Sequence, residues 1–224
     1  MGVVPERVSV TGIPIDPVFS IHKDKHEMRR KHGLAADKLT ILVSAGGFGV
    51  GPIKTLITGL HQLRHPSQIL AICGRNEGLR QELEKLNEGG MTANSSVSVK
   101  VIGFTTEIDE YMAASELVVG KPGGLTSSEA LARGLVFMVV NPIPGQEERN
   151  ADHLLEEGAA LRCNNLPVLA YKIDQLLDDP ARLSAMQSAA RRMARPRAAY
   201  DIVNKLLESR QSWPETDADA DADT

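Results

Sequence analysis

From residue 40 onward, short apolar runs alternate with amphipathic stretches that are long enough to form helices. This alternation is typical of repeated βα units, in which a helix follows each strand and the strands pair in parallel. About six strands are expected, at residues 40–45, 68–73, 97–102, 116–119, 135–140 and 159–161. The pattern therefore predicts an α/β fold with a Rossmann-like, doubly wound parallel sheet.

The composition agrees with a folded α/β protein. With 42% hydrophobic and 24% charged residues, the chain can bury a core, which excludes a wholly disordered protein. The 19 glycines and 12 prolines, beside only 4% aromatic residues, favour many strand-to-helix turns over an aromatic-rich β-sandwich or a helical bundle.

The stretches between the strands predict the helices. They are expected at residues 52–64, 78–88, 126–133, 168–177 and 180–195, with further helices ending near 157 and near 209. The run Thr106-Glu107-Ile108-Asp109 has the form of a capping box and predicts the start of one more short helix.

We divide the chain into three segments. Residues 1–39 do not form a clear βα unit, since VTGIPIDP is an extended, proline-containing stretch and residues 24–32 predict a charged helix. We interpret them as a linker and a leading helix. Residues 40–210 are expected to form the single Rossmann-like domain, and residues 211–224, with their Asp-Ala repeat, a disordered acidic tail.

The charge of the folded part is balanced. The formal charge is −4, with 25 basic and 29 acidic residues, but five of these acids lie among the last ten residues. Without the tail the formal charge is +1, so we expect no nucleic-acid partner that depends on a basic face. The N-terminus has no secretory pattern, and no apolar run reaches the roughly 18 residues needed to span a bilayer. We expect a cytoplasmic protein.

Three glycine-rich turns each follow a predicted strand: Gly46 to Gly51, Gly103-Phe104 and Gly123-Gly124. In an open parallel sheet such turns lie at the carboxyl ends of the strands, where ligands bind. A Gly-Gly pair before a helix lets the backbone approach a phosphate, although each pair alone is also an ordinary turn. Because neither a P-loop nor the dinucleotide spacing is present, ATP hydrolysis and NAD binding are disfavoured.

Two polar segments after predicted strands have both a structural and a functional interpretation. Thr126 to Glu129 (TSSE) has the form of a capping box, and Glu129 also has the chemistry of a ligand contact. The second segment, residues 146–150, places amide and carboxylate groups on a loop that is suited to sugar hydroxyls, or that simply begins a helix.

The order of these segments resembles a known family. The stretch from Lys121 to Ala160, KPGGLTSSEALARGLVFMVVNPIPGQEERNADHLLEEGAA, is similar to the donor-binding signature of family 28 glycosyltransferases. It is most similar to that of processive diacylglycerol glucosyltransferases and monogalactosyldiacylglycerol synthases. VTGIPIDPVF resembles the segment that links the two halves of those enzymes, and ILVSAGGFGVG and VIGFTTEIDEYMAASELVV resemble parts of their C-terminal half. The resemblance covers about residues 8 to 208.

The resemblance implies the C-terminal, UDP-sugar-binding half of a GT-B fold. It places Glu129 on the ribose, residues 123–126 around the diphosphate, residues 103–104 beside the uracil and residues 145–147 near the sugar. The implied donor-binding residues are Gly46, Gly47, Gly103, Phe104, Gly123, Gly124, Leu125, Thr126, Glu129, Gly145, Gln146, Glu147 and Asn150.

The resemblance also implies the reaction: inverting transfer of glucose or galactose from a UDP-sugar to diacylglycerol, without a metal or a cofactor. The acceptor half, which carries the expected general base, is missing from this chain, so no catalytic residue is assigned and the chain alone is expected to be inactive. Association with the membrane surface is expected through the acceptor half.

Several alternatives stay open at this point. The chain is interpreted as a fragment of a longer enzyme, as the donor-binding subunit of a split glycosyltransferase, or as a non-catalytic UDP-sugar sensor. UDP-sugar epimerases share the fold, but the segment Pro144 to Glu147 (PGQE) argues against that class.

Overall fold

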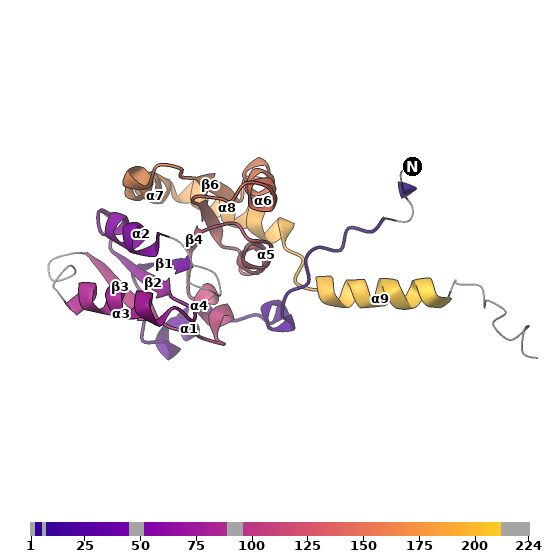
Figure 1. Ribbon diagram of the computed structural model, residues 1–224, viewed down its shortest axis with the longest axis horizontal. Helices are drawn as coiled ribbons and strands as arrows, with labels where there is room; N and C mark the ends of the chain where they lie inside the picture. Colours follow the sequence, from indigo (N-terminus) through magenta and orange to yellow (C-terminus); the bar gives the residue numbers. More distant parts are fainter. Residues whose placement is uncertain (1–2, 6–7, 45–51, 89–95, 212–224) are drawn as a thin grey trace, which may run out of the picture.

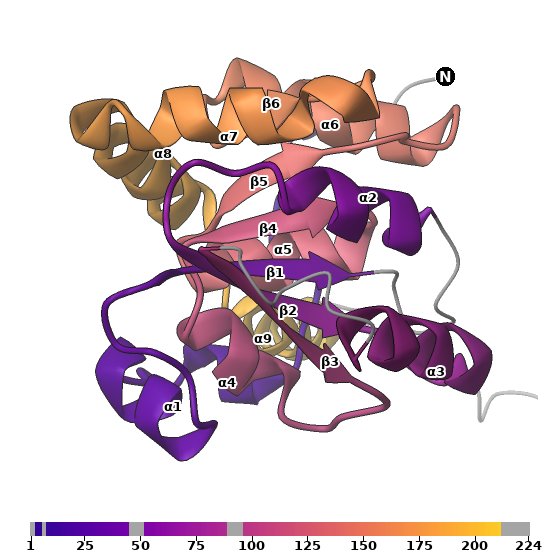
Figure 2. The same cartoon turned by 90° about the vertical axis from the view of Figure 1, so that its left-hand side faces the viewer.

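The computed structural model describes residues 3–5, 8–44, 52–88 and 96–211. Within them, six strands form one parallel sheet in the order β3-β2-β1-β4-β5-β6 (Figure 2). The strands are β1 Leu39–Ser44, β2 Ser67–Ile72, β3 Val97–Ile102, β4 Leu117–Gly120, β5 Val136–Val139 and β6 Ala160–Arg162. This is the doubly wound Rossmann-like order, so the predicted fold class is confirmed.

Both faces of the sheet are buried. Ile41 and Val43 point into one apolar cluster and Leu42 into the other, because successive side chains of a strand lie on opposite faces. One face is covered by α2 Ile53–Leu60, α3 Glu77–Leu86 and α7 Leu169–Leu177. The other is covered by α4 Ile108–Ala113, α5 Gly124–Ala132 and α6 Gln146–Glu156. Helix α8, Pro180–Met193, contributes buried side chains to both clusters.

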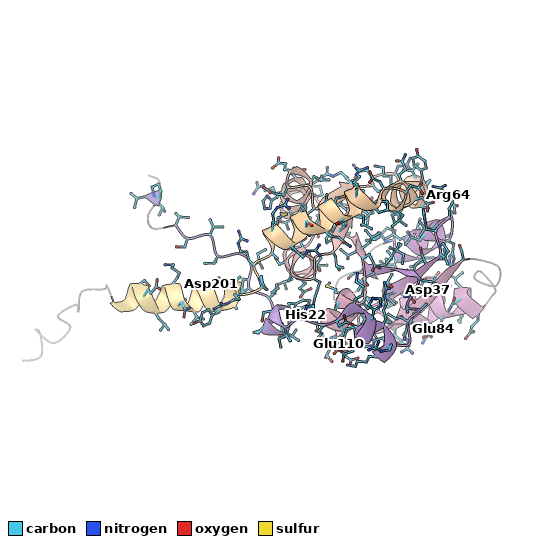
Figure 3. All side chains as sticks on the ribbon, turned by 180° about the vertical axis from the view of Figure 1, so that it is seen from behind. His22, Asp37, Arg64, Glu84, Glu110 and Asp201 are labelled. Atoms are coloured by element: carbon cyan, nitrogen blue, oxygen red, sulfur yellow. The ribbon has the colours of Figure 1, made fainter. Side chains whose placement is uncertain are left out.

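Ion pairs hold the leading segment against this body. It contains the 3-10 helix η2, Pro17–Ser20, and helix α1, Lys25–Lys31. Lys23 Nζ lies 2.6 Å from Asp109 Oδ2 on α4, and Arg133 donates a hydrogen bond of 2.7 Å to the carbonyl of Ile21. Much of the segment that we interpreted as a linker therefore packs on the α4 side of the sheet (Figure 3, where Glu110 marks α4).

The last helix, α9, Ala198–Gln211, projects from the body (Figure 1). The extended N-terminal segment runs out in the same direction, and Asp201 marks α9 in Figure 3. Four large apolar residues of α9 are exposed: Tyr200, Val203, Leu206 and Leu207. No helix in the described ranges is both long and apolar enough to cross a membrane. The predicted tail lies outside these ranges apart from Gln211.

One predicted helix start is wrong in detail. The capping box at residues 106–109 does not form, because α4 begins at Ile108 and its N-cap, Glu107, makes no side-chain capping bond. Instead, the backbone N–H of Glu107 donates to Thr105 Oγ1 at 3.0 Å. The turn that precedes the helix thus satisfies this N–H.

Candidate functional site

The site lies at the carboxyl edge of the sheet, where β1 and β4 are neighbours. The chain leaves β1 toward β2 on one side, whereas β4 continues toward β5 on the other, so this is the switch point of the sheet. A Cβ on Gly120, the last residue of β4, would lie 2.9 Å from the carbonyl oxygen of Ser44. Only glycine fits there, and its absence of a side chain lets the loop after β4 leave close to β1. Gly46 and Gly47 lie outside the described residues.

Helix α5 starts at this edge with no side chain capping it. Its N-cap is Gly123, and its first internal hydrogen bond runs from Ser127 N to Gly123 O at 2.9 Å. The backbone N–H groups of Gly124, Leu125 and Thr126 precede that bond, so they have no acceptor within the helix. Such an end, with the positive pole of the helix dipole, is suited to a phosphate.

The predicted capping box at residues 126–129 is wrong. Because α5 begins at Gly124, Thr126 is already the third residue of the helix and Glu129 lies one turn further in. The side chain of Glu129 therefore does not cap α5. Of the two interpretations of Glu129, the capping residue is excluded and the ligand contact stays a prediction.

Glu129 has no cationic partner among the described residues. Its side chain is half-buried, and in the part of the chain that the structure describes no Lys, Arg or His lies within salt-bridge distance. Burial raises its pKa above the ordinary value, and the negative charge of Asp16 raises it further. Asp16 itself accepts a hydrogen bond of 2.9 Å from Val18 N and so caps η2. An unpaired, half-buried carboxylate is a candidate ligand group.

The loop before α6 comes close to the start of α5. Gly145, with a φ of 104°, is the N-cap of α6, and Gln146 is the first helical residue. A Cβ on Gly124 would lie 3.8 Å from Gln146 Nε2 and 3.0 Å from Ile13 Cδ1. Gln146 and the leading segment thus border the same helix end.

Two other predicted residues hold the loops in place. Glu147 Oε2 accepts a hydrogen bond of 2.7 Å from Ile143 N, which closes the loop before α6. Asn150 Nδ2 donates a hydrogen bond of 2.8 Å to Pro122 O, in the loop before α5. These bonds position the loops, and a direct contact of either side chain with a sugar stays a prediction.

The turn after β3 presents an aromatic ring. Phe104 is 62% exposed, and the Arg75 guanidinium lies over its ring, with Cζ 5.1 Å from the centroid. A Cβ on Gly103 would lie 3.4 Å from Arg80 Cδ, so the glycine gives room to a side chain of α3.

The sequence analysis missed three residues of this site: Ile13, Asp16 and Arg75. Arg75 lies two residues after the predicted strand 68–73, so the reasoning that selected the glycine turns would have found it. The approach of Ile13 and Asp16 to α5 is a long-range contact, and the extended segment that carries them gives no local signal of it.

Together, the fold and the edge define a Rossmann-like α/β protein with a helix N-terminus at its switch point that is suited to an anion. The model of the family described as Glycosyl transferases group 1 matches residues 24–193, so the chain belongs to this family. A processive diacylglycerol beta-glucosyltransferase of Staphylococcus haemolyticus is 35% identical over 207 residues, which are 92% of this chain and 51% of that protein. The chain thus spans about half the length of this curated relative, and the recognised resemblance is confirmed.

Solved structures agree in fold. MurG of Acinetobacter baumannii aligns with a TM-score of 0.64 and 23% identity, over 85% of this chain and 55% of that one. Alr3699/HepE of Anabaena, solved in complex with UDP-glucose, aligns with a TM-score of 0.64 and 20% identity, over 90% of this chain and 56% of that one. This chain has the fold of one half of a GT-B glycosyltransferase.

Proposed function

We propose that this chain is the UDP-sugar-binding half of an inverting hexosyltransferase that transfers glucose or galactose to diacylglycerol. The observation that carries the proposal concerns helix α5. Its N-terminus has no side-chain cap, and Glu129, one turn further along, has no ion-pair partner among the described residues. A nucleoside diphosphate carries both groups that such a pair recognises, an anionic diphosphate and a ribose with two hydroxyls.

Each part of the donor then has a partner. The backbone N–H groups of residues 124–126 bind the diphosphate, and Glu129 accepts hydrogen bonds from the ribose hydroxyls. Phe104 stacks on the uracil. Gln146, which lies beside Gly124, forms hydrogen bonds with hydroxyls of the sugar. As the glycosidic bond breaks, negative charge grows on UDP, and the fixed α5 dipole stabilises it without reorganising.

The acceptor and the general base lie outside this chain in the proposal. The S. haemolyticus relative is named for action on diacylglycerol, and this chain matches only 51% of it. Transfer requires the acceptor hydroxyl and a base to be held against the anomeric carbon, an arrangement worth about 7–11 kcal/mol of barrier. The second half would supply both groups, together with contact to the membrane surface.

A transfer assay tests this division. Labelled UDP-glucose or UDP-galactose is mixed with diacylglycerol vesicles, first with this chain alone and then with the N-terminal half of a relative added. We expect no glycolipid from the chain alone and transfer when the second half is present. Lipid-dependent transfer by the chain alone would contradict the division, because the base would then lie in this chain. If the chain binds UDP-sugar but neither mixture produces glycolipid, the alternative of a non-catalytic UDP-sugar sensor is favoured.

A further inference from the structure

Arg75 lies where the chain turns after β2, and its backbone is held in place. Gly74 before it has a φ of 58°, a conformation that glycine adopts without strain. Asn76 after it caps α3, with Oδ1 accepting a hydrogen bond of 2.9 Å from Leu79 N. The turn thus fixes the point from which the Arg75 side chain leaves the sheet edge.

The guanidinium of Arg75 lies over the ring of Phe104. Its Cζ is 5.1 Å from the ring centroid, within the range of a cation–π contact. None of the carboxylates in the described ranges forms a salt bridge with it. Arg80, the next arginine along the chain, is instead paired with Glu84 at 2.9 Å. The two arginines therefore have different surroundings, and only Arg75 is directed at the ring.

The Phe104 side chain is largely exposed to solvent. The ring is 62% exposed, and Gly103 before it has no side chain to restrict it. An exposed ring that rotates freely loses conformational entropy when a ligand stacks on it. A guanidinium over one face reduces that loss, because the ring is already ordered before the ligand binds.

We propose that Arg75 is a positioning residue that orders Phe104 as a stacking platform for the nucleobase of the donor. The guanidinium covers one face of the ring and leaves the other for the base. This inference rests on the proposed function, since the base belongs to the UDP-sugar. Arg75 acts through Phe104, and its effect is confined to the part of the binding free energy that the base contributes.

Two ligands separate this role from a direct contact with phosphate. UDP carries the base, whereas ribose 5-diphosphate carries the same ribose and diphosphate without it. Calorimetry measures both affinities for the wild-type chain, Arg75→Ala, Phe104→Ala and the double variant. Arg182→Ala is the matched control, because Arg182 is an exposed arginine near the start of α8, far along the chain from this edge. Circular dichroism shows that each variant is folded.

We expect Arg75→Ala to weaken UDP binding about two- to fivefold, the size of an exposed cation–π contact, and to leave ribose 5-diphosphate unchanged. The double variant should bind UDP no more weakly than Phe104→Ala, since both changes remove one platform.

Two kinds of result would overturn the inference. Equal weakening of both ligands would place Arg75 on the phosphates, and additive losses in the double variant would show that the two residues act separately. If Arg75→Ala binds UDP as tightly as the wild-type chain does, this inference alone is overturned. A folded wild-type chain that binds neither ligand would overturn the proposed function and this inference with it.

Discussion

Asn150 on α6 donates a hydrogen bond of 2.8 Å from its side-chain amide to the backbone carbonyl of Pro122, in the loop that leads into α5. The bond joins helix α6 to the loop before α5, between residues that are 28 positions apart in the sequence. The position of the α5 N-terminus relative to Gln146 therefore depends on a side chain that need not touch the ligand.

Asn150→Ala tests this dependence. We expect the free energy of unfolding to fall by about 1 kcal/mol, the net worth of one hydrogen bond, and UDP affinity to fall as well because the loop before α5 loses its anchor. Urea unfolding and calorimetry measure the two effects. Asn204→Ala on α9 is the control and should change neither. Unchanged UDP affinity in a destabilised Asn150→Ala would show that the loop keeps its position without this bond.

Gly120→Ala tests the close approach of β4 to β1. A Cβ there would lie 2.9 Å from the backbone oxygen of Ser44, so we expect a loss of about 1–3 kcal/mol in the free energy of unfolding. Gly123→Ala is the matched control, because its φ of −64° suits any residue and a Cβ would meet no atom of the described residues within 4 Å. Equal stability of the two variants in urea would contradict the packing described at the sheet edge.

The buried pair of Asp109 and Arg133 predicts a large effect on stability. Arg133 Nη2 lies 3.2 Å from Asp109 Oδ2, and both side chains are almost fully buried. Asp109→Ala leaves the arginine charge without this partner, so we expect the free energy of unfolding to fall by about 3 kcal/mol. In Glu208→Ala, which breaks an exposed pair with Lys205, the change should stay within about 0.5 kcal/mol. A comparable loss in both variants would refute the structural role of the buried pair.

The strands could be predicted from the sequence because a parallel sheet that is buried on both faces leaves continuous apolar runs, such as Ile41 to Val43. The helix starts were less predictable. Residues 106–109 and 126–129 both match the pattern of a capping box. The start of each helix is nevertheless set by the residue before the pattern, Thr105 in the first case and Gly123 in the second. Contacts such as that of Ile13 with Gly124 join distant segments, and no local pattern encodes them.

Donor binding should depend on pH through Glu129. Burial, and then the negative charge of Asp16, raise the pKa of Glu129 above its ordinary value in the free protein. In the proposed complex the ribose hydroxyls donate hydrogen bonds to this carboxylate, so binding should favour its ionised form. Affinity for UDP-glucose should thus be highest at pH values above this raised pKa, where Glu129 is ionised, and should fall as the pH drops through it.

Two variants isolate the titrating group. Glu129→Gln should bind weakly with no such pH dependence. Asp16→Asn removes a negative charge near Glu129 but can still cap η2, so the transition should move to lower pH. Calorimetry with UDP-glucose is suitable because both of its phosphates are diesters with constant charge over this range. A pH profile that is the same in Glu129→Gln and in the wild type would assign the transition to another group.

The most direct test of the account is UDP binding by this chain with and without the Glu129 carboxylate. Calorimetry of the isolated chain should show binding of UDP. Glu129→Ala should weaken it about tenfold or more, because charge-assisted hydrogen bonds of about 1.5–3 kcal/mol are removed. A folded chain with no measurable affinity for UDP would contradict the assignment of a donor-binding half. Unchanged affinity in Glu129→Ala would contradict the role of Glu129 at the ribose.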